Sequence, residues 1–112
     1  MSQILIEEIT EGSIFHLKGQ FIGGDETESL RSKLNEYCNN DKNKVVINLE
    51  KVTYLNSTAL GVFITANNNF IRNNGKIILC NISKPIENII VMTKLNLVFT
   101  ITENTNSAIN LI

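Results

Sequence analysis

The sequence has few of the residues that metal sites, disulfide frameworks and catalytic centres require. Among its 112 residues are two cysteines, one histidine, one proline and no tryptophan. Cys38 and Cys80 lie far apart without CxxC spacing, so we expect neither a zinc site nor a disulfide and interpret both as packing residues. His16 has no Cys or Asp at triad-like spacing, which gives little reason to expect nucleophilic catalysis. The sequence therefore predicts no metal site and no cofactor.

Charge and hydropathy limit the class of partner. The formal net charge is −1 and no run of Lys and Arg is present, so a nucleic-acid partner is not expected. No stretch approaches the roughly 20 apolar residues of a membrane helix, so no membrane partner is expected either. The start of the chain lacks a basic segment and turns acidic at Glu7, unlike a signal peptide. We expect a cytoplasmic protein, a monomer or weak dimer, whose partner is another protein.

Apolar periodicity predicts a single α/β domain over residues 1–112. At 43% hydrophobic the chain can form one core. Strands are predicted at 3–9, 13–18, 44–49, 76–81 and 95–101. Helices are predicted over the segment that runs to about Cys38, from Ser57 to the turn at 73–75, after Pro85, and after Asn104. The order ββαβαβαβα predicts a mixed five-stranded sheet with helices packed on it.

The corner at residues 48–61 carries the most chemistry. A short β-branched strand, 44–49, is followed by Asn56, Ser57 and Thr58, which are side chains that cap the N-terminus of a helix. A phosphate on a hydroxyl at this point would be stabilised by the helix dipole. The corner is therefore a candidate modification site.

The helix after Ser57 has two distinct faces on a 3.6-residue wheel. One half, expected to pack on the sheet, contains Ala59, Leu60, Phe63, Ile64, Ala66, Phe70 and Ile71. The other half contains Thr58, Gly61, Val62, Thr65, Asn68, Asn69 and Arg72. This outer half is small and lightly charged near its N-terminus, so it is either a surface for another protein or a solvated face.

Two further features have competing interpretations. Gly23-Gly24 could form a phosphate cradle or a turn, and the turn is favoured because no Lys-Ser/Thr follows and acids crowd the next helical turn. His16 alternates with Phe15 and Leu17 along its strand and is expected to face solvent.

Residues 49–62 resemble the signature of the STAS domains of bacterial anti-sigma factor antagonists. There, a hydrophobic pair usually precedes Asp-Ser-(Ser/Thr)-Gly-Leu-Gly, and the serine after the acid is phosphorylated. That serine falls on Ser57. The chain differs by Asn56 in place of Asp, Ala59 in place of Gly, and Ile22 in place of an Asp before the first helix. The resemblance extends from about residue 3 to residue 110.

The resemblance implies the STAS fold and a partner-switching function. The unmodified protein would bind an anti-sigma factor that is also a serine kinase, which releases the sigma factor, until phosphorylation of Ser57 ends the binding. Thr58 is the alternative acceptor, and ATP and Mg²⁺ would belong to the kinase. Partner-binding residues are expected to be Asn56, Ser57, Thr58, Gly61, Val62 and Thr65. The alternatives are a STAS scaffold subunit of a signalling or transport complex that is not switched, and a small enzyme on this fold.

Overall fold

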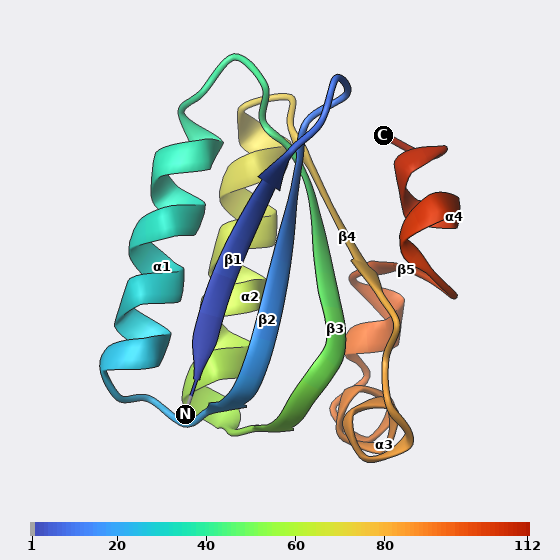
Figure 1. Ribbon diagram of the computed structural model, residues 1–112. Coiled ribbons are helices and arrows are strands. Elements are labelled where there is room, and N and C mark those ends of the chain that lie inside the picture. The colour runs from blue at the N-terminus through green and yellow to red at the C-terminus, as the bar shows by residue number, and fades with distance from the viewer. Residues whose placement is uncertain (1) are drawn as a thin grey trace.

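The computed structural model of the protein describes residues 2–112 (Figure 1). Its elements are, in order, β1 (Gln3–Glu8), β2 (Ser13–Phe21), α1 (Asp25–Cys38), β3 (Lys44–Leu55), α2 (Ser57–Arg72), β4 (Lys76–Cys80), α3 (Lys84–Met92), a 3-10 helix (Leu95–Leu97), β5 (Thr100–Thr102) and α4 (Thr105–Ile109). The predicted order ββαβαβαβα is confirmed, with the 3-10 helix added before β5.

The five strands form one mixed sheet in which the order in space equals the order in the chain. β1 pairs with β2 in antiparallel fashion, and Leu5 lies opposite His16. The pairs β2–β3, β3–β4 and β4–β5 are all parallel. Each parallel pair is joined by a helical crossover, as parallel strands require.

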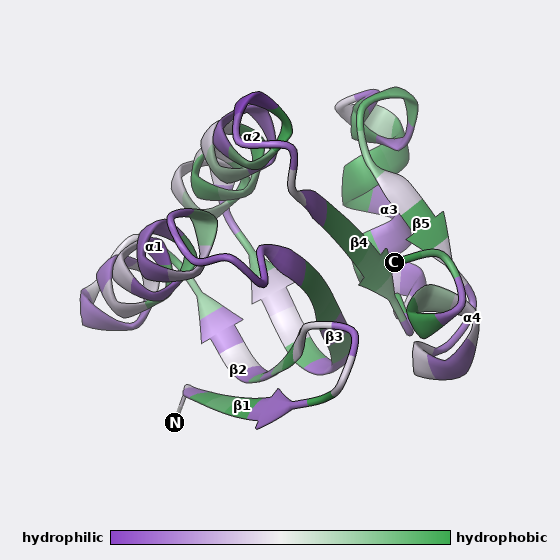
Figure 2. Cartoon of the chain, turned by 90° about the horizontal axis from the view of Figure 1, so that it is seen from above, coloured by the Kyte–Doolittle hydropathy of each residue, from purple (hydrophilic) through white to green (hydrophobic). Residues whose placement is uncertain are grey.

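Strand alternation divides the core between the two faces of the sheet. Phe15, Ile47 and Leu79 point to the face covered by α1, α2 and α3, where the larger core lies. Their neighbours Val46 and Ile78 point to the opposite face and pack with α4. Figure 2 shows α1 and α2 together on one side of the sheet and α4 beside β4 and β5.

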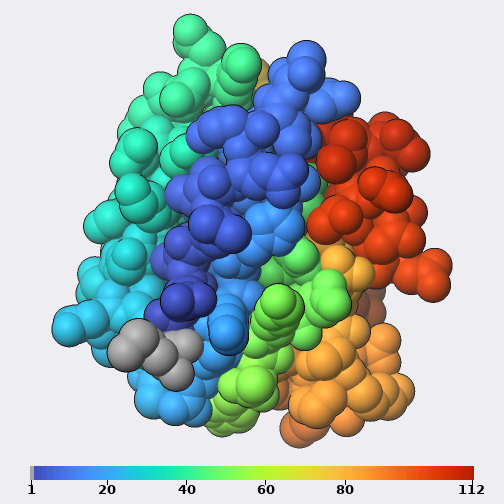
Figure 3. Space-filling view, in the orientation of Figure 1, coloured from blue at the N-terminus to red at the C-terminus, as the bar shows by residue number. Residues whose placement is uncertain are grey.

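The helix α4 covers only part of its face. Figure 3 shows side chains of β1, β2 and β3 at the surface beside the C-terminal segment. Leu5 of β1 is 68% exposed there, and β1 has no neighbour on its outer side in the five-stranded sheet.

The segment 95–101, predicted to be one strand, differs from the expectation. Lys94 has a φ of 61°, a 3-10 helix follows it, and β5 is only three residues long. Leu95 and Phe99 are the buried residues of this segment, and Leu97 midway between them is 78% exposed. A strand would place all three on one face, so this pattern suits a helical turn rather than a strand. Burial of these two side chains therefore decided the local conformation.

Two other strands are longer than predicted: β2 continues to Phe21 and β3 continues to Leu55.

Two predictions about the faces of α2 are wrong. Val62, expected on the exposed half of α2, is 3% exposed and lies in the groove between α1 and α2, beside Leu34. Ile71, expected on the inner half of α2, is 60% exposed. The helix α1 covers one flank of α2, which moves the buried stripe toward Val62.

Candidate functional site

The candidate site lies at the carboxyl ends of β2 and β3, where open α/β sheets commonly form ligand sites. β3 ends at the buried Leu55 and α2 begins two residues later at Ser57. The Asn56 backbone N–H donates to the carbonyl of Phe21 at 3.2 Å, which ties the corner to the end of β2. The site is thus built from two adjacent strand ends and the N-terminus of α2.

Asn56 is the cap of α2, as the sequence predicted. Its backbone is extended, and its side-chain Oδ1 accepts a hydrogen bond from the Ala59 N–H at 3.0 Å. Because Asn56 supplies this bond, the cap does not depend on the hydroxyl groups of Ser57 and Thr58. Both of these side chains are exposed. The corner therefore presents two accessible hydroxyl groups at the positive end of a 16-residue helix.

The loop between β2 and α1 packs against this corner through Gly23. Its φ is 92°, in the left-handed region that favours glycine, and a Cβ there would lie 3.4 Å from the Thr58 side chain. Its N–H donates to Thr27 Oγ1 at 2.9 Å. The glycine thus serves a tight turn and a close approach to Thr58, which supports the turn interpretation of Gly23-Gly24.

Glu26 occupies the amides that a phosphate cradle would need. Its Oε1 accepts from the N–H of Ile22 at 3.0 Å and from the N–H of Gly24 at 3.4 Å. The hydrogen bond from Ile22 holds the pKa of Glu26 below its ordinary value, so the carboxylate is ionised at neutral pH. The sequence placed this acid in the first turn of α1 but did not reveal that it reaches back to the loop.

The exposed face of α2 runs away from the modification site. Ser57, Gly61 and Thr65 follow one another at intervals of four, and Ser57 and Thr65 are exposed. A Cβ at Gly61 would meet nothing within 4 Å, so this glycine leaves the surface open rather than relieving a clash. Ile64 is half-buried and lies beside them, although the wheel placed it inside. We call Ser57, Gly61, Ile64 and Thr65 the open stripe of α2.

Of the predicted partner-binding residues, the structure brings Asn56, Ser57, Thr58, Gly61 and Thr65 together at the N-terminal half of α2. Val62 is excluded from this exposed group because it is buried.

His16 lies away from this site, on the face of the sheet opposite α1 and α2. Its Nε2 is 2.9 Å from Glu7 Oε1, and its Nδ1 is 2.9 Å from Asn48 Nδ2. Asn48 Oδ1 in turn accepts from Asn81 Nδ2 at 3.0 Å. The prediction that His16 faces solvent is therefore only partly right, because its side chain is 30% exposed and held in a polar network that reaches the end of β4.

Other chemical possibilities have little support in the described part of the chain. Residues 2–112 contain no cluster of three His, Cys, Asp or Glu side chains arranged to hold a metal ion. Both cysteines are buried, and burial, with a smaller effect of the Glu50 charge, raises the pKa of Cys80 to about 11. Such a thiol is protonated at neutral pH and is a poor nucleophile. No helix within these residues is long and apolar enough to cross a membrane.

Comparison with known proteins gives a family match and several structural matches. A family model described as the STAS domain matches residues 3–108. No curated protein has a significant match to the sequence.

An anti-sigma factor antagonist from Mycobacterium paratuberculosis superimposes with a TM-score of 0.86 at 17% identity, over 100% of this chain and 94% of that one. The anti-sigma factor antagonist SpoIIAA in its unphosphorylated form gives 0.76 at 19% identity, over 96% of each chain. SpoIIAA of Bacillus in its phosphorylated form superimposes with a TM-score of 0.76 at 16% identity, over 98% of this chain and 100% of that one. A sulfate transporter family protein from Wolinella succinogenes superimposes with a TM-score of 0.75 at 8% identity, over 94% of this chain and 87% of that one. At these identities the likeness is one of fold.

Proposed function

Because the chain belongs to the STAS domain family, we propose that it acts as an anti-sigma factor antagonist switched by phosphorylation of Ser57. The observation that carries the proposal is the exposed Ser57 hydroxyl at the N-terminus of α2, with the cap supplied by its neighbour Asn56. The fold shared with SpoIIAA, whose structure is known in both unphosphorylated and phosphorylated forms, supports it.

In the unmodified state, the proposed partner is an anti-sigma factor with serine kinase activity. It would bind the corner at Asn56 to Thr58 and the open stripe of α2. Apart from the half-buried Ile64, this surface is polar, and it carries no charge in the first turn of α2, so a partner can approach it without displacing an ion pair. Binding would withdraw the anti-sigma factor from its sigma factor and release the latter.

Phosphorylation would end the binding by changing the surface, not the fold. A phosphate on Ser57 brings about −1.5 to −2 charges and three acceptor oxygens. The helix dipole of α2 stabilises that charge within its own domain. Asn56 is neutral where the family usually carries an acid, and Glu26 in the first turn of α1 is the acid that binds the amides of the adjoining loop. The kinase would supply ATP and Mg²⁺, and Thr58 is the alternative acceptor.

The decisive experiment begins with a pull-down from the native cell to identify the partner. The purified chain is then incubated with that partner and ATP, and the phosphate is mapped by fragmentation. We expect label on Ser57, loss of binding on its appearance, constitutive binding by Ser57→Ala and no binding by folded Ser57→Asp. Thr58→Ala is the matched control and should still be labelled. Label on Thr58 alone would move the site by one residue, and no label on a bound chain would contradict switching.

The second candidate is a STAS scaffold subunit that binds a partner without being switched. Two observations favour it: Asn56 and Ile22 replace acids of the family motif, and the fold also occurs in a sulfate transporter family protein. The labelling experiment separates the two functions, because a scaffold binds its partner and remains unmodified. We further propose that the chain meets its partner in the cytoplasm, as a monomer or weak dimer.

A further inference from the structure

A hollow lies against β1, β2 and β3 on the face of the sheet opposite α1 and α2. Its main part has a volume of about 380 Å³ and is lined by Leu5, His16, Leu17, Asn48, Glu50 and Lys51. A smaller part of about 150 Å³ is lined by Gln3, Leu5, His16, Leu17, Lys18 and Lys51. The two parts share four lining residues and are therefore continuous. No residue of α4 lines either part, so the hollow belongs to the sheet surface that α4 leaves uncovered.

Two lysines stand side by side at this hollow. The ladder between β2 and β3 pairs Lys18 directly with Lys51. Neighbouring strands lie about 4.8 Å apart, and residues paired across strands share a face of the sheet. Both lysines line the smaller part of the hollow. The two ammonium groups can therefore reach the same ligand.

A β-bulge brings Lys51 to this face. From one paired position to the next, β2 advances from His16 to Lys18 while β3 advances from Asn48 to Lys51. On β3, residues 49 and 52 are buried, whereas residues 50 and 51 between them are both exposed. Bulges often re-aim a side chain beside a functional site. Here the bulge places a second lysine next to the first.

The positive charge of this pair is uncompensated in the part of the chain that the structure describes. Lys18 and Lys51 are both exposed, and neither forms an ion pair within residues 2–112. Glu7 is occupied by His16 at 2.9 Å. Glu50 lines only the main part of the hollow, and no acid lines the smaller part. Like charges directly opposite each other destabilise a sheet, so this pair lowers stability unless an anion lies between the two ammonium groups.

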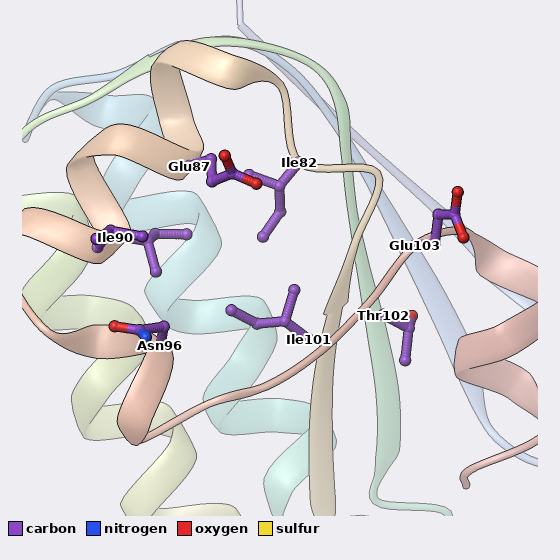
Figure 4. Close-up of a pocket in the computed structure, with 8 residues that line it drawn as sticks. Ile82, Glu87, Ile90, Asn96, Ile101, Thr102 and Glu103 are labelled. Atoms are coloured by element: carbon purple, nitrogen blue, oxygen red, sulfur yellow. The ribbon is translucent and has the colours of Figure 1, made fainter.

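The hollow between α3 and β5 offers a contrast. It is larger, about 440 Å³, and no Lys, Arg or His lines it. Figure 4 shows Glu87 and Glu103, its two charged lining residues. An anion should therefore avoid that hollow and bind at the two lysines.

We propose that the hollow on the open face binds a small phosphate monoester with an apolar body, its phosphate between Lys18 and Lys51. A phosphate dianion matches two ammonium groups, which bind phosphate as point charges. Leu5 is 68% exposed and is paired with His16 on the same face, so it offers an apolar wall for the ester group. The site is separate from Ser57, because α2 packs on the other face of the sheet.

The test is a ¹⁵N-NMR titration of the full chain with phenyl phosphate. We expect saturable shifts at the amides of residues 5, 18 and 51, and none at residues 87 and 103. Benzoate, which carries one charge, and inorganic phosphate, which lacks the apolar body, should each bind more weakly. Lys18→Gln and Lys51→Gln should each weaken binding about two- to fivefold, the size of an exposed ion pair. Lys33→Gln on α1, also exposed but outside the hollow, should leave binding unchanged.

Thermal unfolding supplies a second measurement. Without ligand, Lys18→Gln should be at least as stable as the parent chain, because it removes a like-charge contact. Phenyl phosphate should raise the Tm of the parent chain more than that of Lys18→Gln. Lower stability of both Lys18→Gln and Lys51→Gln without ligand would show that the lysines serve the fold, and would contradict the proposal.

Four binding results would also overturn the proposal. Unshifted amides at residues 5, 18 and 51 would show that the hollow does not bind the ester. Equal binding of benzoate or of inorganic phosphate would show that the site selects neither a dianion nor an apolar body. Equal weakening by Lys33→Gln would show diffuse attraction. Tighter binding to phosphatidylcholine vesicles that contain phosphatidic acid would assign the phosphate to a lipid. Because Ser57→Ala should bind phenyl phosphate normally, failure here is distinguishable from failure of the switching function.

Discussion

The cap of α2 can be tested with a series of substitutions at Asn56. Asn56→Ala removes the acceptor 3.0 Å from the Ala59 N–H. Ala59 is fully buried, so water cannot readily replace the lost partner. The cost should therefore lie in the upper part of the range for caps, about 1–2 kcal/mol in the free energy of unfolding. Asn56→Asp keeps the acceptor and adds a negative charge at a helix whose first turn has none. It should gain about 0.3–1 kcal/mol at low ionic strength.

Urea denaturation followed by circular dichroism measures both effects. The gain from Asn56→Asp should shrink in high salt and should disappear as the pH falls and the new carboxylate is protonated. Ser57→Ala is the control, because its exposed hydroxyl does not supply the cap; it should change stability by less than about 0.5 kcal/mol. If Asn56→Ala costs no more than this control, or if Asn56→Asp is as destabilising as Asn56→Ala, then residue 56 does not cap the helix as described.

Three other predictions concern packing and pH. Phe63→Ala should cost about 3–5 kcal/mol in unfolding experiments, because the ring is 1% exposed and lies edge-on to Phe99 at 6.5 Å; a cost under about 1 kcal/mol would mean that α2 is rotated. Val62→Ala should lower the free energy of unfolding by about 1–3 kcal/mol and leave partner affinity unchanged, because Val62 is 3% exposed. A loss of affinity without a loss of stability would show that Val62 is a surface residue that contacts the partner. Tyr37→Phe removes the 2.6 Å hydrogen bond to Glu8, which lowers the pKa of Glu8 and raises that of Tyr37 to about 12. Ionised Glu8 contributes to folding stability above its ordinary pKa, and this contribution is lost as the pH falls through the lowered pKa. The protonated Tyr37 hydroxyl contributes at lower pH, and its contribution is lost as the pH rises through about 12. A Glu8 pKa that Tyr37→Phe leaves unchanged in an NMR titration would contradict this coupling.

The sequence was sufficient for the fold where local periodicity and tertiary packing agree. Alternation at Phe15 and Leu17 correctly predicted the inner face of β2, and the switch to helical spacing after Ser57 correctly predicted α2. The segment 95–101 was predicted as a strand because its apolar residues form an almost continuous run. Its helical turn buries Leu95 and Phe99 and leaves Leu97 exposed, and no local pattern expresses which of these side chains reach the core.

The candidate site was predictable where it depends on neighbours in the chain. Capping by Asn56 follows from residue type and position, and the structure has that bond. The burial of Val62 could not be predicted from a helical wheel, because the wheel identifies an apolar half but not which flank a second helix will cover. The reach of Glu26 to the Ile22 and Gly24 amides depends on a loop conformation set by Gly23.

The agreement between strand order in space and strand order in the chain has a consequence for how the protein is made. Each new strand to leave the ribosome can add to the edge of a sheet that already exists, starting from the hairpin of β1 and β2. No later strand has to insert between two strands that are already paired. Each pairing step therefore closes only the loop to the preceding strand, which keeps the entropic cost of each step small. The three-residue β5 is added late and is held by β4 alone, so its amides should exchange with solvent before those of β3, which has a partner strand on each side.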